Sequence, residues 1–430
     1  MYRIFYQQER KRRIILERML ANPSGLLGSG LTWEEVRKTI ELQSANKLTI
    51  TTRTSITPFA EGVGLQSLLG VVKADFQAKR KLSEGETTPD WPDEFILKIG
   101  SPVALLKALA AQASKIPEKY AQQMATELVK FMVPCHNAEV VFYNRINNLK
   151  YKIEELPHCY FTKAIEGDIT ESKGFIGMEL IKNAHSLTPA QNFSDDQIKQ
   201  VLKTLVKLEK AFLVVPEDVK NSIPHKGLEG LYATIQDWFL ELNNGIMAQV
   251  PHPKMAQLTK RFAEILPEII SAKDCDQLAE KTGMKKVLVH GDLWAGNILW
   301  SDDGKLKKIV DFQMIHYGLA ATDLTRLFNT CLSPETRREK LETYLKFYHE
   351  CLVENSKDLL RICTFKQLYA SYMTIYPRTA TYLLPALTAV LEKVMHLPDG
   401  EMKQMALGSV IGKVVGIYED IIAIHEENHK

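Results

Sequence analysis

The sequence predicts an α+β protein in which a small lobe built on an antiparallel sheet precedes a larger helical lobe. Short segments rich in Thr, Ile and Val recur between residues 48 and 181 and are typical of strands. From residue 182 onward, apolar residues recur with helical spacing. A chain of 430 residues, 45% of them apolar, is long enough for two substantial cores. We therefore expect a first lobe over residues 1–181 and a second over residues 182–430.

The first lobe is expected to begin with a helical segment. Thr32 followed by Glu35 forms a capping box and predicts a helix to about Leu42. A helix-rich stretch is also expected over residues 103–148, interrupted near Pro117 and Pro134. Strands are predicted from residue 48 to a glycine turn at 61–64, and then over 65–74, 94–99, 159–163 and 174–181. Together they would form a mostly antiparallel five-stranded sheet.

The second lobe is expected to be mainly helical, with few strands. Helices are predicted over residues 195–212, 228–243, 254–271, 321–330, 334–354 and much of the chain beyond 364. Strands are predicted around residues 286–290, 297–300 and 307–312. These strands surround the motif described below.

Composition excludes several classes of function. A formal net charge of +2 gives no global basic field, so a nucleic-acid partner is not expected. The six cysteines contain no C-x-x-C pair, which favours buried free thiols in a reducing compartment. No apolar stretch is long enough to insert into a membrane and no signal peptide is recognised, so we expect a cytoplasmic protein. The basic cluster at residues 10–13 fits either a solvated helix face or an anionic-surface patch.

The strongest functional signal is the segment H-G-D-L-W-A-G-N at residues 290–297, followed by a predicted strand that ends in Asp311. Phosphoryl transfer needs a carboxylate beside the acceptor hydroxyl and oxygen ligands that hold magnesium against the phosphates. Asp292 would orient and deprotonate the acceptor, while Asn297 and Asp311 would bind Mg²⁺. The alternative is a plain β-hairpin in which these polar residues serve turns.

These motifs resemble the catalytic region of the choline kinase and aminoglycoside phosphotransferase superfamily, and more narrowly its ecdysteroid-kinase-like (CHK kinase-like) branch. The resemblance covers roughly residues 30–420 and implies a two-lobed protein-kinase-like fold that uses ATP and Mg²⁺. It also assigns nucleotide-binding positions in the first lobe. These are Gly62, Gly64 and Ser67 in a covering turn, Lys98 on a strand, Glu139 on a helix, and Glu179 and Leu180 in the hinge.

Each of these positions also has a structural explanation. Gly62 and Gly64 would let main-chain amides approach phosphates, but a hairpin turn uses the same residues. Lys98 lies in an otherwise apolar strand, where it either pairs with a buried acid or faces solvent. Glu139 is the partner that the resemblance implies, and Glu127 and Glu118 are the alternatives on neighbouring sequence.

The resemblance also implies that Asp323, near the start of a helix, bonds to the backbone of the catalytic loop. A simple helix-terminal role is the alternative. Trp294 fits an acceptor-pocket wall and a core position equally well.

The acceptor is expected to be a hydroxylated small molecule. Asp323 lies only 12 positions after Asp311, which leaves too few residues for the activation loop of a protein kinase. The resemblance suggests a steroid, a glycoside or a choline-like metabolite. Choline would need an aromatic and acidic cage. Four tyrosines could contribute to it, although core packing explains them as well: Tyr317, Tyr372, Tyr376 and Tyr382. The rival hypothesis is a pseudokinase that binds nucleotide without turnover, and the oligomeric state is not predicted.

Overall fold

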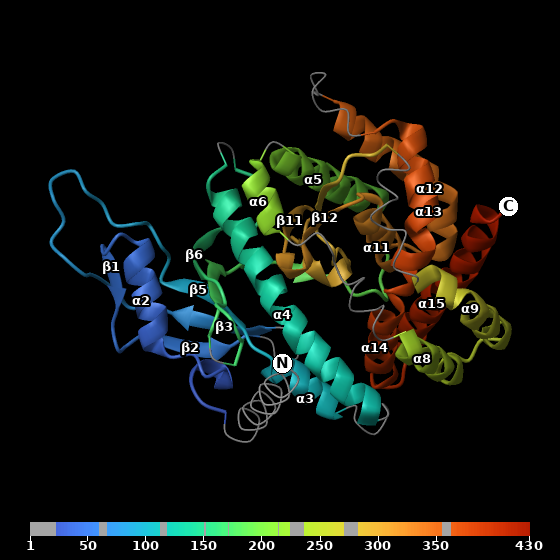
Figure 1. The fold of residues 1–430 in the computed structure, drawn as a ribbon, viewed down its shortest axis with the longest axis horizontal. Helices are drawn as coiled ribbons and strands as arrows, with labels where there is room; N and C mark the ends of the chain where they lie inside the picture. The colour runs from blue at the N-terminus through green and yellow to red at the C-terminus, as the bar shows by residue number, and fades with distance from the viewer. Residues whose placement is uncertain are drawn as a thin grey trace, which may run out of the picture. The chain divides into compact units, whose positions relative to one another are not determined.

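The structure is a computed structural model that describes residues 23–59, 67–111, 118–149, 152–170, 172–213, 215–223, 236–270, 283–354 and 363–430. Its internal contacts divide the chain into two compact units (Figure 1). Unit 1 comprises Met1–Lys152 and Pro157–Lys182, and unit 2 comprises Ile153–Leu156 and Asn183–Lys430. The assignment of one part to nucleotide binding and of the other to the acceptor remains a prediction.

Unit 1 is built on a five-stranded sheet in which every neighbouring pair of strands is antiparallel. The strand order is β2-β3-β5-β7-β6. The strands are β2 (Ser55–Pro58), β3 (Ser67–Lys73), β5 (Glu94–Gly100), β6 (Cys159–Lys163) and β7 (Phe175–Glu179). The segment expected as one strand from residue 48 is divided, because β1 (Leu48–Ile50) leaves the sheet and pairs with β4 (Phe76–Ala78).

The core of unit 1 lies where the sheet meets the helix α2 (Trp33–Gln43). Thr32 accepts from the amide of Glu35, whose side chain accepts from the amide of Thr32, so the predicted capping box is present. The helix contacts β1 and β6. All but the first residue of β5 are buried, as expected for a central strand covered on both faces. The buried core includes Val36 and Ile40 of α2, Phe95, Leu97 and Ile99 of β5, and Phe161 and Phe175.

Two further helices complete unit 1, α3 (Val103–Ala111) and α4 (Glu118–Asn147). The interruption expected at Pro134 is wrong, because α4 continues through this residue. Pro134 is exposed, so the carbonyl group freed by its missing N–H can bond to water, and the helix tolerates it.

Unit 2 is mainly helical and contains two small groups of strands. Three strands pair in the order β11-β10-β8, and β12 pairs with β9, all antiparallel. The strands are β8 (His185–Ser186), β9 (Val287–Val289), β10 (Ile298–Trp300), β11 (Leu306–Ile309) and β12 (His316–Gly318). The helices are α5 (Asp195–Leu213), α6 (Glu217–Ser222), α8 (Gln236–Gln249), α9 (Met255–Ile270), α11 (Ala321–Cys331), α12 (Pro334–Val353), α13 (Phe365–Thr381), α14 (Leu384–Met395) and α15 (Glu401–Asn428).

The predicted fold class is therefore confirmed: an antiparallel sheet with few helices comes first, and a larger helical part follows. The strand expected over residues 307–312 is shorter, because β11 ends at Ile309 and a 3-10 turn occupies Phe312–Met314. β12 was not predicted. Within the described residues, no helix combines the length and the apolar character needed to cross a bilayer.

Candidate active site

In unit 1, Lys98 and Glu139 form a buried ion pair. Lys98 lies on β5, opposite Leu69 of β3 and Ile176 of β7. Its Nζ lies 2.8 Å from Oε1 and 2.6 Å from Oε2 of Glu139, which projects from α4. The two side chains are only 7% and 0% exposed, so each charge depends on the other. The predicted pairing is present, whereas Glu127 bonds to Lys130 instead.

The structure describes some of the other predicted nucleotide-binding positions and not others. Gly62 and Gly64 lie outside the described residues. Ser67 is the buried first residue of β3 and pairs with Gly100 of β5. Their role in nucleotide binding stays a prediction.

The hinge positions lie at the end of β7. The carboxylate of Glu179 accepts from the amide of His158 at 3.0 Å, and its amide donates to the carbonyl oxygen of His158 at 2.8 Å. Leu180 follows and is half-buried. Glu179 thus joins the end of β7 to the residue just before β6. Its role in nucleotide binding stays a prediction.

In unit 2, the loop after β9 has a conformation that depends on glycine. Gly291 has a φ of 80°, and a Cβ atom there would lie 2.2 Å from the carbonyl oxygen of Met314. His290 is fully buried, and its Nδ1 accepts from the amide of Asp292 at 3.2 Å. Its Nε2 therefore carries the proton and donates to the carbonyl oxygen of Val310 at 3.1 Å. The imidazole thus links the loop to the chain just before Asp311.

Asp323 holds the same loop from the first turn of α11. The amide of His290 donates to Oδ2 at 2.7 Å, and the amide of Gly291 donates to Oδ1 at 2.9 Å. This contact confirms the bond to the loop backbone that the resemblance implies. Burial raises the pKa of Asp323, while the His290 imidazole and the two amide donors act in the opposite direction.

Two side chains fix the carboxylate of Asp292. Asn297 donates from Nδ2 to the main-chain oxygen of Asp292 at 2.9 Å and to Oδ2 at 3.2 Å. Arg326 of α11 donates from Nη2 to Oδ1 at 2.6 Å, with a side chain only 8% exposed. The sequence analysis missed Arg326, although its position three residues after Asp323 places both on neighbouring parts of one helix face.

Asp311 follows β11 in a left-handed conformation, with a φ of 71° and a ψ of 68°. Such a conformation is uncommon for a residue with a side chain and is concentrated at functional sites. The amide of Val310 donates to the carbonyl oxygen of Asn297 at 2.9 Å. Gln313 donates from Nε2 to Oδ2 of Asp311 at 3.4 Å. The chain at Asp311 is thus joined directly to the chain at Asn297.

The aromatic residues named from the sequence differ in exposure. Trp294 is half-buried, and a Cβ atom at Gly296 would lie 2.6 Å from its ring, so the indole covers the loop beside Asp292. The four tyrosines suggested for a choline cage are all buried, with at most 5% exposure. Core packing therefore explains Tyr317, Tyr372, Tyr376 and Tyr382, as the structural alternative proposed.

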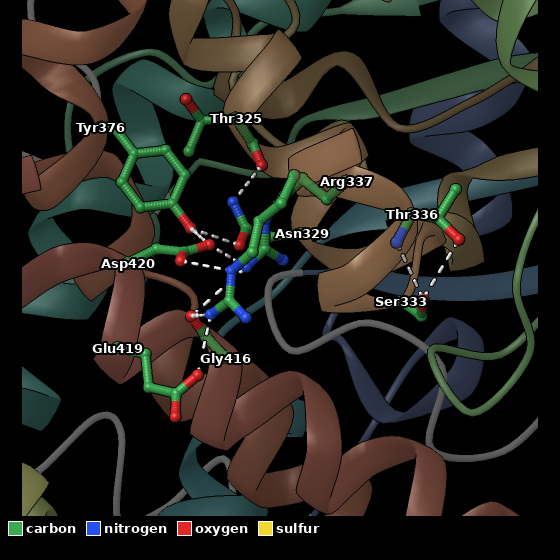
Figure 2. Close-up of polar contacts among 10 residues, drawn as sticks. Thr325, Asn329, Ser333, Thr336, Arg337, Tyr376, Gly416, Glu419 and Asp420 are labelled. Carbon is green, nitrogen blue, oxygen red and sulfur yellow. Dashed lines mark hydrogen bonds and ion pairs between the residues drawn. The ribbon is translucent and has the colours of Figure 1, made fainter. Parts of the chain in front are cut away.

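A buried polar network fastens α11, the helix of Asp323 and Arg326, to its neighbours (Figure 2). Tyr376 of α13 donates to Oδ1 of Asn329 at 2.8 Å, and Asn329 donates to the carbonyl oxygen of Thr325 at 2.8 Å. Arg337 of α12, only 2% exposed, pairs with Asp420 of α15. The hydroxyl of Tyr376 also contacts Oδ2 of Asp420 at 3.5 Å, so α11 is linked through α13 to the pair that joins α12 and α15.

Comparison with known proteins assigns the chain to a family. A family model described as DUF1679, "Uncharacterized oxidoreductase dhs-27", matches residues 19–429. The chain belongs to the DUF1679 family. One relative in sequence is an uncharacterized kinase-like protein of Caenorhabditis elegans, 25% identical over 239 residues, which is 55% of this chain and 61% of the relative. The kinase-like resemblance predicted from the motifs is therefore confirmed.

The second relative is the C. elegans protein after which the family model is described. It is 22% identical over 289 residues, or 62% of this chain but only 32% of that relative. The chain thus spans less than two thirds of the length of either relative. Among solved structures, the ethanolamine kinase of Plasmodium vivax is similar at 12% identity and a TM-score of 0.45, with 96% of each chain covered.

Proposed function

We propose that this member of the DUF1679 family is an ATP- and Mg²⁺-dependent phosphotransferase that acts on a hydroxyl group of a small molecule. The observation that carries the proposal is the double hydrogen bond from Asn297 to Asp292. It fixes an acidic side chain on a loop whose backbone is itself held by Asp323. A fixed carboxylate of this kind suits an acceptor hydroxyl in phosphoryl transfer.

The side chains of unit 2 also fit a magnesium ion. Because Nδ2 of Asn297 donates to Asp292, the side-chain oxygen Oδ1 of Asn297 is the atom that can bind a cation. Asp311 supplies a carboxylate, and its chain is joined to that of Asn297 by the Val310 amide. Magnesium is commonly held by one or two protein oxygens together with water and phosphate oxygens. In the proposal, Asn297 and Asp311 are these ligands.

Unit 1 supplies the proposed nucleotide contacts. A Lys–Glu pair between a strand and a helix is the arrangement that positions phosphates in kinases, and Lys98 with Glu139 has this form. When bound, ATP would supply the phosphoryl group and Mg²⁺ would neutralise its charge. Ser67, Gly62, Gly64, Glu179 and Leu180 are proposed as further nucleotide contacts.

The proposed acceptor is a metabolite such as a steroid, a glycoside or a choline-like alcohol, and the proposed location is the cytoplasm. The short interval between Asp311 and Asp323 supports a small acceptor, because β12 and the start of α11 fill it. A buried cage of tyrosines for choline has no support, since the four candidates are core residues.

A second candidate function is a nucleotide-binding pseudokinase, and one contact favours it. Oδ1 of Asp292 is bonded to Arg326, a partner that would compete with an acceptor hydroxyl. The two candidates differ in turnover rather than in nucleotide affinity.

A turnover assay with labelled ATP and a panel of steroids, glycosides and choline separates the candidates. The kinase proposal expects a Mg²⁺-dependent phosphorylated product. Asp292→Asn should then abolish turnover while ATP with Mg²⁺ still raises the melting temperature. Product formation by this variant at near the wild-type rate would refute the role of Asp292. Nucleotide binding without any product or ATP hydrolysis would favour the pseudokinase.

A further inference from the structure

Three potential metal ligands converge where α9 lies beside the end of α15 (Figure 1). Glu268 belongs to α9, and His425 and His429 come from the last turn of α15 and its cap. One ligand atom from each lies within 4.8 Å of the other two, the one such group of three found among the described residues. Nε2 of His425 is 3.1 Å from Oε2 of Glu268, and Nε2 of His429 is 3.8 Å from the same oxygen.

The hydrogen bonding of His429 prepares its other nitrogen for a metal. Its Nδ1 lies 2.7 Å from the main-chain oxygen of His425. A carbonyl oxygen only accepts, so Nδ1 carries the proton and Nε2 keeps its lone pair. Histidines that bind metals commonly donate their second N–H to a carbonyl or carboxylate group in this way. The nitrogen with the free lone pair is the one that faces Glu268.

Two of the three separations suit a tetrahedral ion. Bonds of about 2.0–2.2 Å from zinc to nitrogen or oxygen place neighbouring ligands about 3.3–3.6 Å apart. The separations of 3.1 and 3.8 Å from Glu268 lie on either side of this range. The ligand atoms of the two histidines lie within 4.8 Å of each other, so the exposed side chains of Glu268 and His429 would rotate to complete the geometry.

The electrostatic surroundings favour a cation at this position. The end of α15 presents carbonyl groups and the negative end of the helix dipole. The positive charge of Arg261 acts on His425, but Arg261 is also paired with Glu264 and Glu426, each at 2.9 Å. These two carboxylates offset part of its charge.

We propose that Glu268, His425 and His429 form a three-ligand site for a borderline divalent transition-metal ion, with Zn²⁺ as the expected occupant. Imidazole nitrogens suit zinc and are poor ligands for Mg²⁺, so this site differs in chemistry from the proposed magnesium ligands. A bound ion would fasten α9 to α15 and leave one coordination position open to water. The site stabilises unit 2 and takes no part in phosphoryl transfer.

The test is calorimetric titration of the full chain, freed of metal by chelation, with Zn²⁺ alone. One ion should bind per chain, and His429→Ala and Glu268→Gln should each weaken binding by roughly 10- to 100-fold. His396→Ala is the matched control. His396 caps α14 and its Nδ1 contacts the carbonyl oxygen of Glu392, four residues earlier, but it belongs to no three-ligand group among the described residues.

A second readout distinguishes metal binding at this site from metal binding by the cysteines. Co²⁺ bound here should show a visible spectrum of nitrogen and oxygen ligation without thiolate charge transfer, and His429→Ala should remove it. Zn²⁺ should raise the melting temperature of the wild-type chain and of His396→Ala, but not of His429→Ala. The proposal is overturned if Zn²⁺ does not bind, if His429→Ala binds it as tightly as the wild type, or if His396→Ala loses binding equally.

Discussion

The guanidinium of Arg326 donates to Oδ1 of Asp292 at 2.6 Å, so the proposed catalytic carboxylate is held from a neighbouring helix. Asn297 holds the other oxygen, Oδ2, from the same loop. The two contacts leave the carboxylate group little rotational freedom. A hydroxyl that approached Asp292 would share an oxygen with one of these donors.

This relationship predicts that Arg326 positions Asp292. Arg326→Gln should lower kcat by about tenfold or more, because the carboxylate loses its orientation, while KM for ATP changes little. Arg326→Lys, which keeps a charge, should recover part of the rate. A steady-state assay with the acceptor found in the screen measures both. An Arg326→Gln enzyme with higher kcat would show that Arg326 instead competes with the acceptor.

We predict that variants of the Lys98–Glu139 pair affect stability and affinity for ATP differently. Lys98→Met leaves a buried carboxylate and should cost about 3–5 kcal/mol of unfolding free energy. The double variant Lys98→Met/Glu139→Gln should recover much of that loss but not the affinity for ATP. Urea unfolding and nucleotide titration measure the two effects.

The control for this experiment is Lys182→Met. Lys182 pairs with Glu94 at 2.7 Å in the same unit, with a side chain 64% exposed, so its loss should cost about 1 kcal/mol or less. If the double variant binds ATP like the wild type, the pair is structural only.

Asp311 is predicted to bind magnesium. Asp311→Ala should remove the part of nucleotide binding that depends on Mg²⁺, because a carboxylate ligand is lost. Titration of nucleotide with and without Mg²⁺ measures it. Asp302→Ala, at a carboxylate that is 94% exposed in a nearby turn, should bind as the wild type does. Unchanged metal dependence in Asp311→Ala would exclude the ligand role.

We predict that the titration of Glu209 lowers the stability of the folded chain as the pH rises. This side chain of α5 is almost fully buried against the Tyr348 hydroxyl, and burial raises its pKa from 4.5 to about 8. The folded state therefore keeps a proton that the unfolded state releases above pH 4.5. Stability falls as the pH rises from 4.5 to 8, by roughly 5 kcal/mol in all.

Glu209→Gln removes this titration and keeps the shape of the side chain. Urea midpoints at pH 5 and pH 8 should differ less in Glu209→Gln than in the wild type. Glu350→Gln, at an exposed position of α12, should retain the wild-type difference. The same difference in Glu209→Gln would mean that Glu209 is already ionised in the folded state.

The sequence was sufficient for features that follow from local chemistry. Lys98 stood out because a charge in an apolar strand needs a partner, and Glu139 is that partner. The fold class followed from the change in periodicity near residue 182. The break expected at Pro134 was wrong, because sequence alone does not show that this proline faces solvent.

Features that depend on packing between distant segments were not predicted. Arg326 reads as an ordinary helical arginine until α11 is seen beside the loop of Asp292. The spacing of His425 and His429 is visible in the sequence, but Glu268 joins them only because α9 packs on α15. The short strand β12 carries too few residues to show a period.

The interval between Asp311 and Asp323 has a consequence for regulation. It is filled by a 3-10 turn, by β12 paired with β9, and by the start of α11. Its tyrosine, Tyr317, is 5% exposed and its hydroxyl donates to the carbonyl oxygen of Phe212 at 3.2 Å. A modifying kinase cannot reach that hydroxyl in the folded chain. Phosphorylation at this tyrosine would therefore require local unfolding of the segment that carries it.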